Sequence, residues 1–147
     1  MPKRFMFLVM AGLFACATFG NAQQAITAVQ IKTVPVKQTS AASGESMYVN
    51  YCAACHGANG KGGGPALSAL STRPTDLTTL ARNNGGKFPT NHVVVVLRYG
   101  LTRPSQGSVD MPAWGPILGS MDQANQAAEE QQRISNLTRF LNTMQVN

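Results

Sequence analysis

Charged residues are scarce in this sequence: Asp, Glu, Lys and Arg make up 12% of its 147 residues, against roughly 25% in an ordinary protein. This shortage argues against a disordered chain or a coiled coil, both of which depend on many charges. Hydrophobic residues reach 44%, so a buried core is possible, and the length allows one domain with a tail. The composition fits a small exported domain whose core is partly filled by an apolar ligand.

Clusters of basic residues are also missing. The formal net charge is +6, but Lys and Arg are scattered and form no run. Nucleic-acid binding relies on groups of Lys and Arg that neutralise phosphates. We therefore expect no nucleic-acid partner.

The apolar stretch from Phe5 to Phe19 is too short to span a bilayer comfortably, and no stop-transfer pattern follows it. Lys3 and Arg4 precede it, and the small residues of 20–22 follow it, as in a secretory signal peptide. We predict a signal peptide over residues 1–22, cleaved after Ala22, and hence an exported, periplasmic protein.

Two alternatives to cleavage after Ala22 stay open. An uncleaved N-terminal segment could anchor the protein to the membrane. Residues 13–16, Leu-Phe-Ala-Cys, resemble a lipobox, in which Cys16 would become the lipidated first residue. Phe14 is bulky for that motif, so ordinary cleavage is the favoured interpretation.

Cysteine is rare once residues 1–22 are removed. The remaining chain has ten basic and six acidic side chains, a formal charge of +4, and only two cysteines. Cys52 and Cys55 are so close that a disulfide between them would close only a tiny loop. A disulfide scaffold is therefore excluded, and the two thiols must serve another purpose.

The rest of the chain predicts a small all-α domain over residues 44–147, preceded by an extended leader or tether over residues 23–43. Apolar residues at steps of three and four, with capping residues at the ends, indicate helices. We expect helical segments at 44–57, 65–70, 91–99 and 122–143, separated by Gly- and Pro-rich loops at 57–64, 71–89 and 101–118. Such long loops around few helices suggest that something other than protein fills the middle.

The strongest chemical signal is Cys52-Ala53-Ala54-Cys55-His56. Two thiols three residues apart on a helical turn can each add to a vinyl group of haem, which forms two thioether bonds. His56 would then lie under the iron as an axial ligand. The C-x-x-C-H pattern is typical of c-type haem attachment.

Two other interpretations of these residues are weaker. A redox Cys-x-x-Cys would require alternating strands and helices of the thioredoxin type, which the pattern does not show. A zinc site would require further ligands, and outside the signal peptide the chain offers only His92. We therefore predict one covalently attached haem c.

The second axial ligand has several candidates. Met111 is favoured because it lies in a loop, next to Pro112, with enough chain to wrap round the haem; a His/Met pair also raises the reduction potential. Met121 is the alternative. Met47 lies on the predicted helix over 44–57 that carries Cys52 and Cys55, which we call the attachment helix. Met144 lies at the frayed end of the last helix, and His92 is expected to be a surface or core histidine.

In this order, the C-x-x-C-H motif, Gly64-Pro65-Ala66-Leu67, the Met111-Pro112 loop and a C-terminal amphipathic helix resemble class I cytochromes c. The similarity covers about residues 44–146. It is closest to bacterial monohaem carriers that have a Gly-Gly-Lys-Phe-Pro segment and a Met-Pro-x-Trp-Gly loop, here residues 85–89 and 111–115.

The resemblance implies a bundle of three to five helices around one haem. The Pro65 carbonyl would accept a hydrogen bond from His56 and so fix its tautomer. Trp114 would pack near the haem edge or a propionate, although a plain core role is as good an interpretation. Gly44 and Tyr48 on the first helix would meet the last helix at Leu137 and Phe140.

The function implied is one-electron transfer between exported redox protein donors and acceptors, with a haem edge exposed near Cys52 and Cys55. The chain itself would be a carrier without a small-molecule substrate. Two alternatives remain: a cytochrome subunit of a membrane-associated oxidoreductase complex, and an open-site haem peroxidase or ligand sensor, which requires that Met111 does not bind iron.

Overall fold

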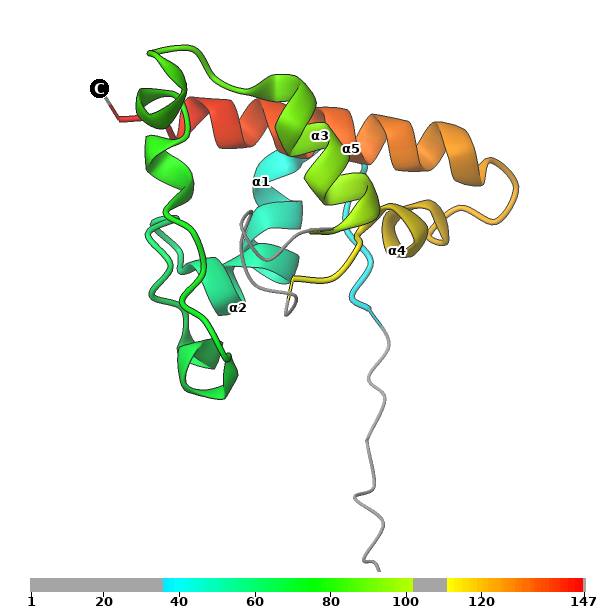
Figure 1. Cartoon of the computed structure of the whole chain (residues 1–147). Coiled ribbons are helices and arrows are strands. Elements are labelled where there is room, and N and C mark those ends of the chain that lie inside the picture. Colours follow the sequence, from blue (N-terminus) through cyan, green and yellow to red (C-terminus); the bar gives the residue numbers. More distant parts are fainter. Residues whose placement is uncertain (1–35, 102–110, 147) are drawn as a thin grey trace, which may run out of the picture. The chain divides into compact units, whose positions relative to one another are not determined.

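The computed structural model describes residues 36–101 and 111–146, and among these residues it contains helices and no strand (Figure 1). The predicted signal peptide (1–22) and residues 23–35 of the predicted leader lie outside the described residues. The elements are α1 (Gly44–Met47), η1 (Tyr48–Cys52), α2 (Ala53–His56), η2 (Pro65–Ala69), η3 (Leu77–Thr79), η4 (Arg82–Asn84), α3 (Thr90–Tyr99), α4 (Gly115–Gly119) and α5 (Gln126–Thr143). The predicted all-α class is confirmed.

The first helical segment runs without a break through α1, η1 and α2, close to the predicted range of 44–57. Ser43 caps it, since its side chain accepts a hydrogen bond from the backbone N–H of Ser46 at 3.0 Å. The middle of the segment, η1, is π-helical, and the N–H of Ala53 bonds the carbonyl of Tyr48 five residues earlier. Such wide turns are often found at functional sites. No sequence pattern predicted this one.

The first helical segment meets α5, and a glycine allows the close approach (Figure 1). A Cβ on Gly44 would collide with the Asn136 carbonyl and lie 2.7 Å from Cβ of Phe140. One turn later, the Tyr48 and Phe140 rings lie 5.5 Å apart between centroids. The expected meeting of these two helices is therefore confirmed.

Helix α3 forms despite four consecutive valines. Val93 and Leu97 are buried, whereas Val95 is 51% exposed, so one face packs and the other meets solvent. The helix ends where expected, at Gly100, whose φ of +74° suits glycine. The helix begins one residue before the predicted range of 91–99, because the Pro89 carbonyl already accepts the N–H of Val93 and makes Thr90 the first helical residue.

Two boundaries in the C-terminal third differ from expectation. The predicted loop over 101–118 contains the short helix α4, and α5 begins at Gln126 instead of Asp122. The Asp122 carboxylate accepts hydrogen bonds from the N–H groups of Ala124 and Asn125 at 2.9 and 3.3 Å. This local turn competes with helix formation and delays the start of α5. The helix ends at Thr143, as expected.

The hydrophobic core is small and comes from every long element. Its buried members are Met47, Tyr48, Tyr51, Cys52, Val93, Leu97, Leu118, Ile134, Leu137 and Leu141. They lie where α1, η1, α3, α4 and α5 meet. Several of these side chains also line a cavity, so packing alone does not fill the middle of the domain.

Candidate haem site

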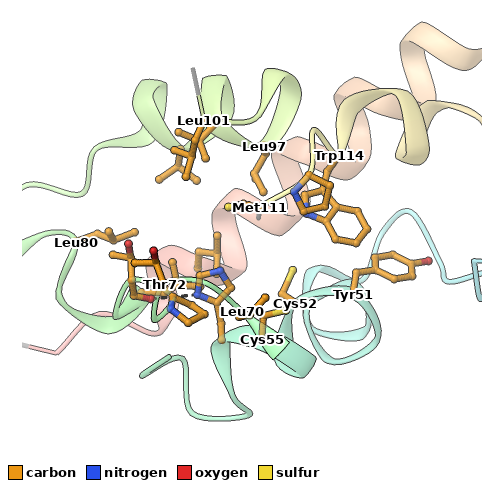
Figure 2. Close-up of a pocket in the computed structure, with 18 of the residues that line it drawn as sticks. Tyr51, Cys52, Cys55, Leu70, Thr72, Leu80, Leu97, Leu101, Met111 and Trp114 are labelled. Atoms are coloured by element: carbon orange, nitrogen blue, oxygen red, sulfur yellow. Dashed lines mark hydrogen bonds between the residues drawn. The ribbon is translucent and has the colours of Figure 1, made fainter. Parts of the chain in front are cut away.

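A large cavity opens between the attachment helix, the 70–80 segment, α3 and the segment that starts at Met111 (Figure 2). It holds about 1100 Å³ of space not filled by protein atoms, including the part open to solvent. Small-molecule and cofactor sites are usually lined mostly by apolar side chains. The walls here are likewise mostly apolar, with contributions from Leu70, Leu77, Leu80, Val93, Val96, Leu97, Leu101 and Leu141.

Both thiols of the C-x-x-C-H motif lie on this cavity, and neither forms a disulfide. Cys52 ends η1 and is 9% exposed, while Cys55 lies in α2 and is half-buried. Burial, together with the nearby Cys55, raises the pKa of the Cys52 thiol to about 12. At neutral pH the Cys52 side chain is therefore a neutral thiol against an apolar space.

His56 also lines the cavity, and its tautomer follows from one hydrogen bond. Its Nδ1 lies 3.1 Å from the carbonyl oxygen of Thr75. Because a carbonyl only accepts, Nδ1 carries the hydrogen, and in the neutral ring the lone pair belongs to Nε2. Burial lowers the pKa of His56, and the Thr75 bond offsets this in part. The neutral imidazole is the form that binds a metal ion.

The hydrogen bond to His56 corrects the role expected for Pro65. Pro65 is exposed and does not line the cavity, and Thr75 takes its place as the partner of His56. Gly64 packs directly against the carbonyls of Ala53 and Ala54, so a Cβ there would clash with both. This contact places η2 beside α2 and away from the cavity. The chain returns to the cavity at Leu70 and lines it again at residues 72–75.

The methionines considered for the second axial position differ in whether they line the cavity. Met111 lines the cavity and points into the space on the side opposite Cys55 (Figure 2). Met121 does not line it; its Sδ lies 3.6 Å from the Tyr51 hydroxyl, which points away from the cavity. Met47 is fully buried in the core, and Met144 packs against Gly60.

His92 was expected to be a surface or core histidine. It is exposed, yet it lies at the start of α3 on the wall of the same cavity. Apart from His56, it is the only histidine in the described part of the chain, and it is a second possible nitrogen donor at this site.

Trp114 lines the cavity and stacks on Tyr51. The ring centroids are 5.6 Å apart and the planes differ by 24°. The Trp114 backbone N–H donates to the carbonyl of Leu97 at 2.8 Å, which ties the end of the Met111 segment to α3. Tyr51 as a cavity residue was not foreseen, although its place one residue before Cys52 was a signal.

A further residue missed from the sequence is Gln145. Its Nε2 donates to the carbonyl of Leu77 at 2.8 Å, and its Oε1 accepts the N–H of Ala81 at 2.9 Å. The side chain thus holds the segment that carries Leu77 and Leu80 onto the end of α5. A polar residue near the C-terminus gives no sequence signal for such a contact.

Residues 36–101 and 111–146 lack two features. No three His, Cys, Asp or Glu side chains come together there as they would for a metal ion bound by protein alone. None of the helices in these ranges is long and apolar enough to cross a membrane.

Residues 39–129 match the family model described as cytochrome c oxidase, cbb3-type, subunit III. No curated protein and no solved structure shows a significant match. The matched range includes the C-x-x-C-H motif, the His56–Thr75 contact, Met111 and Trp114, and it ends just inside α5. The chain belongs to this family and is a class I c-type cytochrome, an all-α domain that carries covalently bound haem c and its iron.

Proposed function

We propose that this protein is a one-electron carrier in which Cys52 and Cys55 hold haem c, and His56 and Met111 provide the axial ligands. The observation that supports this most strongly is that all four side chains line one cavity. The family supplies the coarser conclusion, haem-based electron transfer. When bound, haem c supplies an iron that gains and loses one electron.

The side chains on the attachment helix suit this assignment. The Cys52 thiol is neutral and faces an apolar space, and Cys55 is half-buried one helical turn later. Thr75 holds the proton of His56 on Nδ1 and so leaves Nε2 as the ligating nitrogen. An orientation fixed by a backbone carbonyl limits movement of the imidazole when the charge of the site changes.

Met111 supports a carrier over a haem enzyme. A thioether on the cavity wall can fill the remaining axial position, whereas peroxidases and ligand sensors need that position open. A His/Met pair also raises the reduction potential of the iron. The apolar side chains around the cavity exclude water, which lowers the reorganisation that accompanies electron transfer.

The attachment is tested with the Cys52→Ala/Cys55→Ala double variant, expressed with the same export signal. We expect all haem to separate from the polypeptide under denaturing conditions, because no thioether remains. The matched control is Cys16→Ala, which should keep its haem covalently bound. Covalent haem in the double variant would contradict the assignment of both thiols.

The carrier role is tested with carbon monoxide on the native ferrous holoprotein. A carrier with both axial positions filled binds the gas slowly or not at all at neutral pH. Rapid binding at submillimolar concentrations would favour the peroxidase or sensor alternative instead.

The second candidate function is that of a cytochrome subunit in a membrane-associated oxidoreductase complex. The description of the matching family, an oxidase subunit, favours it. Mild detergent extraction followed by size-exclusion chromatography distinguishes the two. Fixed stoichiometric partners would identify a subunit, whereas a free monomer that exchanges electrons with several exported proteins would identify a mobile carrier.

The location proposed is the periplasm, with residues 1–22 removed and residues 23–43 as a leader to the domain over 44–147. Haem attachment of this type takes place outside the cytoplasm, which supports export. Mass spectrometry of the mature N-terminus checks it. A chain that starts at Gln23 supports cleavage, and a lipid on Cys16 would place the protein on the membrane surface.

A further inference from the structure

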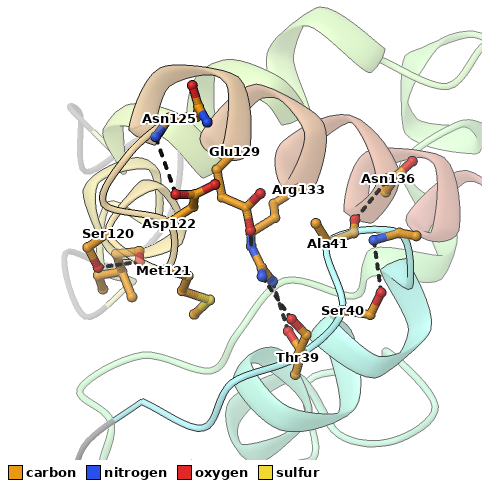
Figure 3. Close-up of polar contacts among 12 residues, drawn as sticks. Thr39, Ser40, Ala41, Ser120, Met121, Asp122, Asn125, Glu129, Arg133 and Asn136 are labelled. Atoms are coloured by element: carbon orange, nitrogen blue, oxygen red, sulfur yellow. Dashed lines mark hydrogen bonds and ion pairs between the residues drawn. The ribbon is translucent and has the colours of Figure 1, made fainter.

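Residues 37–41 lie on the domain although they precede the first helix, and we call them the N-terminal strap (Figure 3). The guanidinium of Arg133 donates to both oxygens of Thr39, from Nη1 to the hydroxyl at 3.0 Å and from Nη2 to the carbonyl at 2.8 Å. The Asn136 side chain donates to the carbonyl of Ala41 at 2.7 Å. Two residues of α5 therefore hold the strap in place.

The anchor of the strap is rigid because Arg133 is buried. Its hydrogen-bond partners lie on α5 and on the strap, and the residue is only 3% exposed. Its Nε donates to Oε1 of Glu129 at 2.6 Å, so the guanidinium has partners on both sides. A buried guanidinium with these bonds has one favourable orientation, and the position of Thr39 is fixed with it.

The strap also forms hydrogen bonds with Tyr51. The Tyr51 hydroxyl donates to the carbonyl of Lys37 at 2.6 Å. Its oxygen is also 2.7 Å from the Thr39 hydroxyl, and because the single hydrogen of Tyr51 is already used, Thr39 is the donor in that bond. The polar end of Tyr51 is thus held by the strap from two directions.

The other end of Tyr51 touches the haem site. Its ring lines the cavity and stacks on Trp114, three residues after Met111. The backbone N–H of Trp114 bonds α3, whereas the side chain of Trp114 is held by its stack on Tyr51, which belongs to the attachment helix.

We propose that Tyr51 is a positioning residue, which transmits the order of the N-terminal strap to the segment that carries Met111. The chain of contacts runs from Arg133 to Thr39, Tyr51 and Trp114 without a gap. Loosening the strap would let Tyr51 tilt and would let the thioether leave the iron more often. The proposal rests on the proposed function, in which Met111 binds the iron.

The test uses the full-length ferric holoprotein and the rate at which imidazole replaces the axial thioether. At saturating imidazole this rate reports how often the thioether leaves the iron. Tyr51→Phe keeps the ring on Trp114 and removes only the hydroxyl, so we expect the rate to rise about threefold to tenfold, the range that corresponds to one lost hydrogen bond. Thr39→Val should raise it in the same direction by a smaller factor.

Tyr99→Phe is the matched control, because Tyr99 is 63% exposed and does not line the cavity; its exchange rate should equal that of the wild type. A purely structural role for Tyr51 would lower the denaturation midpoint and leave the exchange rate unchanged, and that result would overturn the proposal. If Tyr51→Phe does not accumulate, Thr39→Val, at a half-buried position of the strap, decides in its place: a faster exchange supports the proposal and a wild-type rate overturns it.

The proposal and the axial assignment fail in different ways. If Met111→Ala loses the iron–thioether absorption band while Tyr51→Phe exchanges at the wild-type rate, only the role of Tyr51 is wrong. If Met111→Ala keeps the band, the axial assignment is wrong and the role of Tyr51 falls with it.

Discussion

On one side of the cavity, backbone contacts hold Cys52, Cys55 and His56, which we call the attachment wall. On the other side lie Met111 and Trp114, the loop wall, where the backbone hydrogen bond from Trp114 to Leu97 is joined by the stacking of the Trp114 side chain. Gly64 packs on the carbonyls of Ala53 and Ala54 with no room for a side chain. The loop wall depends on the Tyr51–Trp114 stack and on the strap behind it.

This difference matches the tasks of the two walls. Covalent attachment and a fixed imidazole require little movement, and short backbone contacts provide that. A thioether bond to iron is weaker, and its geometry depends on contacts between residues far apart in the chain. We therefore expect changes in the attachment wall to affect mainly folding, and changes behind the loop wall to affect the state of the iron in addition to stability.

The largest effect is expected for Gly64→Ala. The new Cβ would meet the carbonyls of Ala53 and Ala54, which are backbone atoms and cannot turn away. We expect a loss of at least about 3 kcal/mol in the free energy of unfolding, measured by denaturant titration of the holoprotein. Gly63→Ala is the control, since its Cβ would find no atom closer than 4.0 Å. Equal losses in the two variants would contradict the close contact.

A smaller loss is expected when the anchor of the strap is removed. Arg133→Met keeps most of the volume but leaves Glu129 and Thr39 without their buried partner. We expect a loss of about 2–3 kcal/mol, since breaking a buried pair leaves an uncompensated charge. The comparison is Arg98→Met on the more exposed Arg98–Glu130 pair, where the cost should be about 1 kcal/mol or less. Thermal unfolding of both variants decides whether burial makes the difference.

The smallest effect concerns Tyr48 and alkaline pH. Its hydroxyl donates to the Gly57 carbonyl at 2.6 Å, and burial raises the pKa of Tyr48 from 10.0 to about 12. The unfolded chain loses this proton near pH 10 and the folded chain only near pH 12. Stability from this group is therefore complete below pH 10 and is lost as the pH rises to 12, by about 2 kcal/mol.

Tyr48→Phe should remove this pH dependence, although it also costs the hydrogen bond at neutral pH. Denaturant titrations between pH 8 and pH 12, followed by far-ultraviolet circular dichroism, provide the check. A variant whose stability falls over this interval as steeply as that of the wild type would show that another group is responsible.

The sequence was sufficient to predict the all-α class, the first helical segment and the haem, because each depends on local patterns: a C-x-x-C-H turn, apolar spacing and a glycine at a helix end. Met111 could be singled out only as a methionine in a loop. Its place on the cavity follows from long-range packing, which local patterns do not encode.

The remaining differences have physical causes of the same kind. Thr75 replaces Pro65 as the partner of His56 because a packed glycine directs η2 away from the cavity. The late start of α5 comes from hydrogen bonds made by one aspartate. The strap that contacts Tyr51 is held by a buried arginine far along the chain, and no spacing rule connects residues 94 positions apart.

The most direct test of the two walls is the optical spectrum and potential of the Met111→Ala holoprotein beside Met121→Ala. Met111 lines the cavity, whereas Met121 lies by the Tyr51 hydroxyl outside it. We predict that Met111→Ala loses the iron–thioether charge-transfer band and has a lower reduction potential, while Met121→Ala keeps both. A Met111→Ala protein with the wild-type band and potential would contradict the axial role of Met111 and, with it, the division into two walls.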